Sequence, residues 1–136
     1  MAKVAIVYAT TTGNTEQLAN AFADGAKAAG KDVTLTTADS ADAATTLAAD
    51  EIFLGSPAMG SEQLEDSMED FFSSIESKLS GKSVGLFGSY DWGDGQWLSD
   101  WSDRVTAAGA TLLGTVKAHL TPEDADVAAA KALSAK

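Results

Sequence analysis

Five short runs that read as strands, each followed by a segment of helical character, constrain the fold of this chain more than any other feature. The predicted strands are residues 3–8, 32–37, 51–55, 83–88 and 110–117. The first is almost continuously apolar through Val4-Ala5-Ile6-Val7, and the third is similar, which indicates strands buried on both faces of a parallel sheet. The run 32–37 alternates apolar residues with threonines, so it is expected nearer an edge of the sheet.

The segments after these strands predict helices over residues 15–29, 38–49, 63–79 and 96–108, and a last helix that Thr121 caps and Pro122 opens. The segment 38–49 contains only one large apolar residue, Leu47, so a short helix is expected there. Regular alternation of strand and helix predicts an α/β fold, in which a five-stranded, doubly wound parallel sheet carries helices on both faces. Ligands of such sheets bind beyond the carboxyl ends of the strands.

Composition narrows the class of protein. A length of 136 residues suits a single domain over residues 1–136. The chain has no cysteine, which excludes disulfides, thiolate catalysis and Cys-ligated metals. A formal charge of −11 would repel nucleic acid and anionic membranes; it suits either simple solubility or the attraction of basic partner proteins. No signal peptide and no run of membrane-spanning length is evident, so we expect a cytoplasmic protein without a membrane partner.

The turn between the first strand and the first helix is rich in short donors. It contains Thr10, Thr11, Thr12, Gly13, Asn14 and Thr15. One helix cap would account for one such residue, whereas a phosphate bound at the helix N-terminus accounts for all of them. The turn lacks the Gly-Lys-Ser/Thr ending of a nucleoside triphosphate loop and the Gly-x-Gly-x-x-Gly of a dinucleotide fold. It also lacks any lysine or arginine, so neutral donors would hold the phosphate.

Two other loops contain large residues that no periodicity explains. Met59 lies in a polar loop after the third strand, where its simplest interpretation is core packing. Trp92 lies among glycines and aspartates after the fourth strand, and a planar ligand stacked between Met59 and Trp92 would account for both. Trp97 and Trp101 are one helical turn apart and are expected to be packing residues. His119 is expected on the surface without a role, and no catalytic triad, carboxylate dyad or metal cluster is apparent.

Over its whole length the chain resembles the flavodoxins, in particular the short-chain group from anaerobic bacteria. The resemblance rests on three motifs: Thr-x-Thr-Gly-Asn-Thr at 10–15, Gly-Ser-Pro-Ala-Met-Gly-Ser-Glu at 55–62, and Gly-Ser-Tyr-Asp-Trp-Gly-Asp-Gly at 88–95. It implies the strand order 2-1-3-4-5, a non-covalently bound FMN, and the transfer of single electrons to redox partner proteins. Asp91 and Ser61 depart from what many relatives carry.

The resemblance also implies roles for individual residues. The first motif would bind the FMN phosphate, and Met59 and Trp92 would flank the isoalloxazine ring. The carbonyl of Gly60 would turn toward flavin N5, Glu62 would bind the N3–O4 edge, and Ser89 and Tyr90 would contact the pyrimidine end through their backbone. The complete set of expected FMN contacts is Thr10, Thr11, Thr12, Gly13, Asn14, Thr15, Pro57, Ala58, Met59, Gly60, Ser61, Glu62, Ser89, Tyr90, Asp91, Trp92 and Gly93.

These features predict a monomeric, low-potential carrier that shuttles between flavin semiquinone and hydroquinone and serves partners with basic patches. Acidic residues would disfavour the anionic hydroquinone; they are Glu62, Glu65, Asp66, Asp91 and Asp94. One alternative is an FMN-dependent quinone reductase on the same fold, which would need extra loops for a substrate pocket. A phosphoacceptor signalling domain shares the fold, but Gly55 and Thr10 stand where it needs acidic residues.

Overall fold

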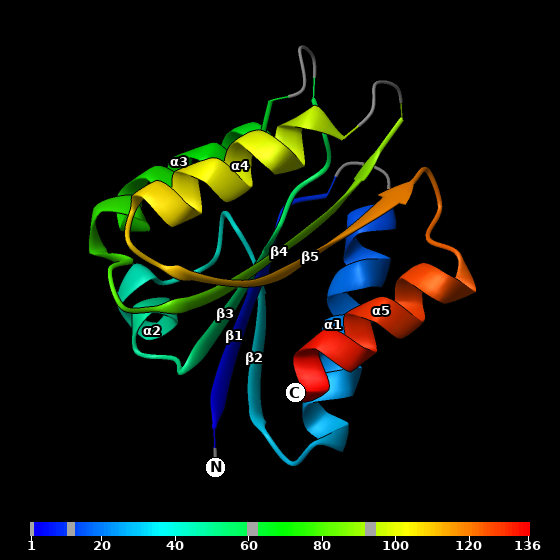
Figure 1. Cartoon of the computed structure of the whole chain (residues 1–136), viewed down its shortest axis with the longest axis horizontal. Helices are drawn as coiled ribbons and strands as arrows, with labels where there is room; N and C mark the ends of the chain where they lie inside the picture. Colours follow the sequence, from blue (N-terminus) through cyan, green and yellow to red (C-terminus); the bar gives the residue numbers. More distant parts are fainter. Residues whose placement is uncertain (1, 11–12, 60–62, 92–94) are drawn as a thin grey trace.

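The computed structural model describes residues 2–10, 13–59, 63–91 and 95–136. Its centre is one parallel sheet of five strands in the order β2-β1-β3-β4-β5 (Figure 1). The strands are β1 (Lys3–Tyr8), β2 (Asp32–Thr37), β3 (Glu51–Gly55), β4 (Ser83–Tyr90) and β5 (Thr111–His119). This order confirms the prediction, and it makes β1, β3 and β4 the three interior strands.

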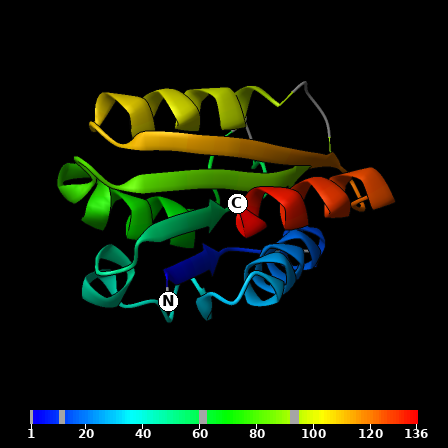
Figure 2. The ribbon, with the colours of Figure 1, turned by 60° about the horizontal axis from the view of Figure 1, so that its bottom comes forward.

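Helices cover both faces of the sheet, so the molecule has three layers (Figures 1 and 2). One face carries α1 (Asn14–Ala28) and α5 (Asp124–Ala135), which pack side by side. The other face carries α2 (Ala43–Leu47), α3 (Asp66–Ile75) with a short 3-10 turn (Glu76–Lys78), and α4 (Gln96–Ala107). In the part of the chain that is described, no helix is both long enough and apolar enough to cross a bilayer.

Each face of the sheet has its own apolar core. In the core under α1 and α5, helix α1 contributes Leu18, Phe22 and Ala26. All three are fully buried, as their helical spacing predicts. The Phe22 ring lies 4.9 Å from that of Phe53 and 4.7 Å from that of Phe87, measured between ring centroids. The opposite core, under α3 and α4, is filled by large side chains from both helices, including Met68, Phe72, Ile75, Trp97, Leu98, Trp101 and Val105.

Two helices begin later than predicted because acidic side chains cap them. The helix expected over 38–49 is only the five-residue α2, where the Asp42 carboxylate accepts the backbone N–H of Thr45 at 2.9 Å. The helix expected from Gln63 begins at Asp66, because Glu65 is the N-cap and accepts the N–H of Ser67. Local capping thus took precedence over the wider apolar pattern.

The carboxyl ends of β4 and β5 also differ from the prediction. Both strands continue two residues further, to Tyr90 and His119, because they pair with each other throughout. The last helix was expected to be capped by Thr121, but α5 begins at Asp124. Its capping box joins Glu123 and Asp126, whose side chain accepts the Glu123 N–H at 2.9 Å. Ser89 and Tyr90 therefore lie in a strand and not in a loop.

Candidate functional site

The loops after β1, β3 and β4 begin at the same edge of the sheet because these strands are neighbours. We call them the first loop (9–13), the second loop (56–65) and the third loop (91–95). Backbone hydrogen bonds continue past the strand ends: Ala9 N donates to Gly55 O at 2.9 Å, and Ser56 N donates to Phe87 O at 3.1 Å. The first residues of the first and second loops are therefore held by backbone hydrogen bonds that continue those of the sheet.

The first loop leads into α1, whose N-terminus is not capped by any side chain of the described residues. Gly13 is the N-cap residue, with φ of 89°, a left-handed conformation that glycine adopts at little cost. Its N–H donates to Thr10 Oγ1 at 3.0 Å, which closes the turn. A glycine has no side chain with which to cap α1, so the first-turn amides are left for another acceptor. A phosphate matches this donor set.

A tyrosine and a glutamate flank the same turn. Tyr8 ends β1, and its hydroxyl donates to the Glu16 carboxylate at 2.9 Å. Burial, together with this hydrogen bond to a carboxylate, raises the pKa of the Tyr8 phenol, which therefore stays neutral and remains a donor. Sequence reasoning assigned no role to either residue. Their bond fixes a negative charge in the first turn of α1, next to the predicted phosphate site.

Ser89, at the end of β4, is the point at which the three segments meet. Its carbonyl accepts the N–H of Ala58 from the second loop at 2.9 Å. Its hydroxyl lies 3.0 Å from that of Thr15, in the first turn of α1. Both hydroxyl-bearing residues are buried. Three residues that the sequence placed in separate motifs are therefore in direct hydrogen-bond contact.

The second loop is closed at its base by Ser56, which is fully buried. Its hydroxyl accepts the N–H of Glu65 and donates to the carbonyl of Pro57, both at 2.9 Å. Its own carbonyl accepts the indole N–H of Trp97 at 3.2 Å. There is no room for a side chain at Gly88, where an added Cβ would lie 2.0 Å from the Ser56 oxygen.

Met59 lies further along the second loop and is not core packing. The residue is 37% exposed, and among the described residues it is one of two large apolar residues that are exposed. Its backbone pairs with Gln63 through two hydrogen bonds of 2.8 Å, which form an isolated antiparallel bridge. An exposed methionine on a closed bridge is available to contact a ligand at this edge of the sheet.

The third loop begins from a strand end that β5 holds. Tyr90 O accepts the N–H of Leu120 at 2.8 Å, and His119 Nε2 donates to Asp91 O at 2.9 Å. The Tyr90 ring packs against the rings of Trp97 and His119, with centroid distances of 5.6 and 5.0 Å. His119 is exposed, which confirms its predicted place on the surface, and it also contacts the start of the third loop.

The predicted site residues fall into two groups. Those that the structure places around the carboxyl edge are Thr10, Gly13, Asn14, Thr15, Pro57, Ala58, Met59, Ser89, Tyr90 and Asp91. Those that lie outside the described residues are Thr11, Thr12, Gly60, Ser61, Glu62, Trp92 and Gly93. Sequence reasoning missed the supporting residues Ser56 and Trp97. Ser56 lay within a quoted motif, but nothing in its neighbourhood indicated that its hydroxyl closes the loop.

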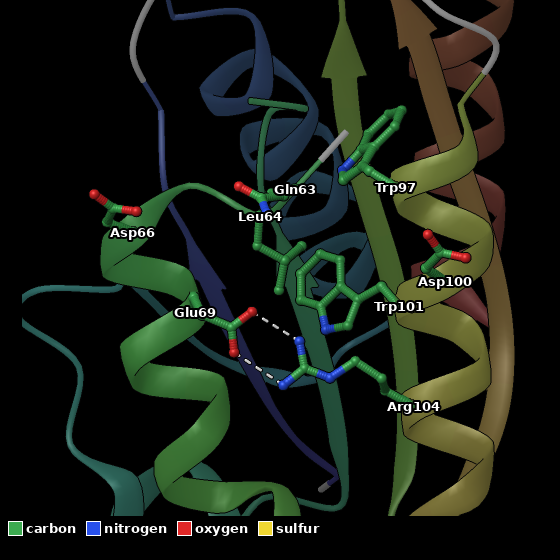
Figure 3. Close-up of a pocket in the computed structure, with 8 residues that line it drawn as sticks. All are labelled: Gln63, Leu64, Asp66, Glu69, Trp97, Asp100, Trp101 and Arg104. Carbon is green, nitrogen blue, oxygen red and sulfur yellow. Dashed lines mark hydrogen bonds and ion pairs between the residues drawn. The ribbon is translucent and has the colours of Figure 1, made fainter. Parts of the chain in front are cut away.

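A separate cavity of about 310 Å³ lies between α3 and α4, and its wall includes Gln63 of the second loop (Figure 3). Arg104 spans it, with two hydrogen bonds to the Glu69 carboxylate at 2.8 and 2.9 Å and a further ion pair to Glu76 at 3.1 Å. These bonds lower the pKa of Glu69 and raise that of Arg104. The buried Trp101 Nε1 in this wall has no hydrogen-bond partner among the described residues. Arg104 joins the helices that follow the second and third loops.

The sequence of this chain matches one family of known proteins. The family model described as Flavodoxin matches residues 6–132. The flavodoxin of Megasphaera elsdenii is 47% identical over 123 residues, which is 90% of each chain. The flavodoxin of Clostridium beijerinckii is 43% identical over 111 residues, 81% of this chain and 80% of that one.

The fold agrees with this relationship. The solution structure of two-electron reduced M. elsdenii flavodoxin superposes with a TM-score of 0.90 and covers 97% of this chain and 98% of that one. Nearly the full length of the sheet and its helices is therefore shared. With its family match, its uncapped α1 and its three converging loops, the chain belongs to the flavodoxins, a family of FMN-binding proteins that transfer electrons and are not enzymes.

Proposed function

We propose that this flavodoxin is a low-potential, one-electron carrier whose bound FMN shuttles between semiquinone and hydroquinone. The first loop and the start of α1 bind the phosphate through Thr10 to Thr15. Met59 and Trp92 flank the ring, and Gly60 and Glu62 serve its N5 and N3 edge. The remaining contacts come from Pro57, Ala58, Ser61, Ser89, Tyr90, Asp91 and Gly93.

One observation carries this proposal furthest. The exposed Met59 lies in the second loop, and the uncapped N-terminus of α1 follows the first loop. Hydrogen bonds of Ser89 connect the second loop and the first turn of α1 at one edge of the sheet. A ligand with an apolar planar end and an anionic tail matches such a pair of sites. FMN has this shape, and it supplies the redox chemistry once it is bound.

The charge of the protein supports a low potential. The chain contains nine lysine and arginine residues and twenty aspartate and glutamate residues. One unit charge about 10 Å from the flavin contributes ~1.7 kcal/mol at an effective dielectric constant of ~20, which is roughly 70 mV for one electron. Glu65, Asp66 and Asp91 are candidates within the described residues. Each makes a further negative charge on the flavin less favourable, and salt weakens the effect of exposed groups.

The phosphate part of the proposal is tested by comparing FMN with riboflavin. Titration of the apoprotein, followed by quenching of flavin fluorescence, should give much tighter binding of FMN. Asn14→Ala should reduce this preference, whereas Ser99→Ala on the outer face of α4 should leave it unchanged. Equal affinities for FMN and riboflavin in the parent protein would rule out a phosphate site in the first loop.

The redox part is tested by anaerobic titration with dithionite. Two separate one-electron steps, with the long-wavelength absorbance of a neutral semiquinone between them, are expected. A single two-electron step would contradict the proposal. Steady NADPH-dependent reduction of a quinone would instead favour the alternative enzyme, which no relative named above supports.

The acidic surface predicts partners with basic patches. Electron transfer from the reduced protein to a basic cytochrome c should slow steeply as ionic strength rises, because salt screens the attraction between opposite charges. With an acidic acceptor, electron transfer should instead become faster as ionic strength rises.

Analytical ultracentrifugation tests the expected monomer, and the cytoplasmic location remains a prediction from the sequence.

A further inference from the structure

The cavity between α3 and α4 is distinct from the proposed FMN site (Figure 3). None of the described residues that we expect to contact FMN lines it. Its volume of about 310 Å³ lies at the lower end of the range for small-molecule sites, roughly 300–1,000 Å³. The cavity is therefore of a size for a small organic molecule or a single side chain and not for a second cofactor.

The apolar part of the cavity wall contains a hydrogen-bond donor that is not used. Leu64, Trp97 and Trp101 line the cavity, and all three are buried. The indole N–H of Trp97 donates to the Ser56 carbonyl, whereas Trp101 Nε1 has no partner among the described residues. Leaving a buried donor unpaired costs free energy. The Trp101 N–H therefore favours any acceptor that enters the cavity.

Arg104 cannot be that acceptor. In Figure 3 the nitrogen of the Trp101 ring is turned toward the Arg104 guanidinium, which has five N–H groups and accepts no hydrogen bond. Its bonds to Glu69 and Glu76 use four of these groups, so one N–H at Nη1 makes no bond to a described residue. Trp101 is fully buried, so an acceptor reaches its N–H when the Arg104 side chain, which is 33% exposed, gives way.

The charges around the cavity decide what kind of acceptor fits. Its wall contains three carboxylates, those of Asp66, Glu69 and Asp100, and one cation, Arg104, which already pairs with Glu69. Asp66 of α3 and Asp100 of α4 are exposed on the two helices that flank the cavity. These carboxylates repel an anion and attract a cation. The acceptor oxygen is therefore expected to be uncharged and to belong to a molecule that also carries a positive charge.

We propose that this cavity is a second binding site, which takes an organic cation that also bears a carbonyl group. The carbonyl oxygen accepts the N–H of Trp101, and the cation lies near the carboxylates of Asp66 and Asp100. The carbon chain between the two groups packs on the apolar wall. An arginine or lysine residue has all three parts, either in a free amino-acid derivative or in a protein chain. The site does not depend on the flavin, so it goes beyond the proposed function.

The indole N–H resonances report directly on this site. The chain has three tryptophans, and Trp101→Phe identifies the Trp101 signal in the ¹H–¹⁵N spectrum of the FMN-bound protein. The probe is N-acetylarginine amide, and N-acetylcitrulline amide is its uncharged analogue of similar shape. The arginine probe should move the Trp101 resonance downfield, the citrulline probe should move it less, and N-acetylglutamate amide should leave it in place. No movement with the arginine probe, or equal movement with the citrulline probe, would overturn the proposal.

Two pairs of substitutions separate a local site from general attraction to an acidic protein. Asp66→Asn with Asp100→Asn removes the two carboxylates of the cavity. Asp70→Asn with Asp103→Asn removes the same charge from exposed positions of the same helices that do not line it. The first pair should weaken binding of the arginine probe by roughly two- to tenfold, as the loss of two exposed charge pairs implies. The second pair should leave binding nearly unchanged, and an equal loss in both would contradict a local site.

Trp101→Phe tests the donor, because phenylalanine retains an aromatic ring but has no N–H. The backbone amide resonance of Leu64 follows binding in this variant, which should hold the arginine probe more weakly than the parent protein. Unchanged affinity would show that the carbonyl is not bound at Trp101. Thermal unfolding of each variant shows whether it folds as the parent does.

Ferrous cytochrome c, which is basic and diamagnetic, distinguishes the two sources of the ligand. If a basic residue of a partner protein enters the cavity, cytochrome c should move the Trp101 resonance and N-acetylarginine amide should reverse this shift. If the ligand is a free molecule, only the small probe should move it. Either result supports the site. A Trp101 resonance that no probe moves overturns this site alone, whereas the proposed function fails only if FMN binding or stepwise reduction fails.

Discussion

The hydroxyls of Thr15 and Ser89 are 3.0 Å apart and buried, so one hydrogen bond joins the first turn of α1 to the end of β4. The two residues are 74 positions apart in the chain. Ser89 also accepts the backbone N–H of Ala58. The phosphate-binding and ring-binding parts of the proposed FMN site are therefore mechanically connected through a single serine.

Removing one of these hydroxyls leaves the other buried without its partner. Thr15→Val should lower the free energy of unfolding of the apoprotein by about 1–3 kcal/mol, and Ser89→Ala should have a similar effect. Urea denaturation measures both. The double variant should be less destabilised than the sum of the two, because neither hydroxyl then remains unpaired. Strictly additive losses would show that the bond does not form.

Met59 and Met68 provide a matched pair for separating a ligand contact from core packing. Met59 is 37% exposed, and Met68 is fully buried on the inner face of α3. Met59→Ala should change apoprotein stability by less than about 0.5 kcal/mol but weaken FMN binding and shift the flavin potentials. Met68→Ala should cost about 2–5 kcal/mol with little specific effect on the potentials. Denaturation and redox titration of both variants check this, and a large loss of stability in Met59→Ala would contradict it.

Leu120 combines a strained backbone with an exposed side chain. Its φ is 62° and the residue is 47% exposed, so its side chain gains little from packing. The left-handed conformation costs a residue with a Cβ about 1–2 kcal/mol, and asparagine tolerates it better. Leu120→Asn should therefore raise the free energy of unfolding by up to about 1 kcal/mol, measured by urea denaturation. Leu120→Ile should lower it, because β-branched residues adopt positive φ least readily. Equal stabilities would show that no strain is stored there.

The ion pair of Glu69 with Arg104 predicts a dependence of stability on pH. The hydrogen bonds from Arg104 lower the folded-state pKa of Glu69 below its unfolded value. A lowered carboxyl pKa stabilises the protein above the unfolded pKa, and this contribution is lost as pH falls through the folded pKa. The Glu69 side chain is 42% exposed, so solvent screens the interaction.

Glu69→Gln should thus reduce the free energy of unfolding by about 0.5–1 kcal/mol near neutral pH. The difference from the parent protein should begin to shrink as pH falls below the unfolded pKa of about 4.3, and it should disappear only below the lower folded-state pKa of Glu69. Unfolding curves at a series of pH values provide the measurement. In an Arg104→Leu background the same substitution should have little effect, and a full effect there would assign the stabilisation to another partner.

The main features of the fold were predictable because they depend on patterns within single segments. The apolar run Val4–Val7 and the face of Leu18, Phe22 and Ala26 each follow from the spacing of neighbours in one strand or helix. The boundaries were less predictable, because they depend on local competition. The Glu65 carboxylate, for instance, decides where α3 begins, although apolar periodicity continues before it.

The alternation of strand and helix, the donor-rich turn at 10–15 and the three motifs that identify a flavodoxin can all be seen in the amino-acid sequence. The side chains that support the proposed site become apparent only once the chain is folded. The Ser89 bond to Thr15, the Trp97 bond to the Ser56 carbonyl and the His119 bond to Asp91 each join residues 28 or more positions apart. Such contacts depend on strand register and on where a helix returns to the sheet. No periodicity within one segment contains that information, which is why the contact between His119 and the start of the third loop could not be predicted from the sequence.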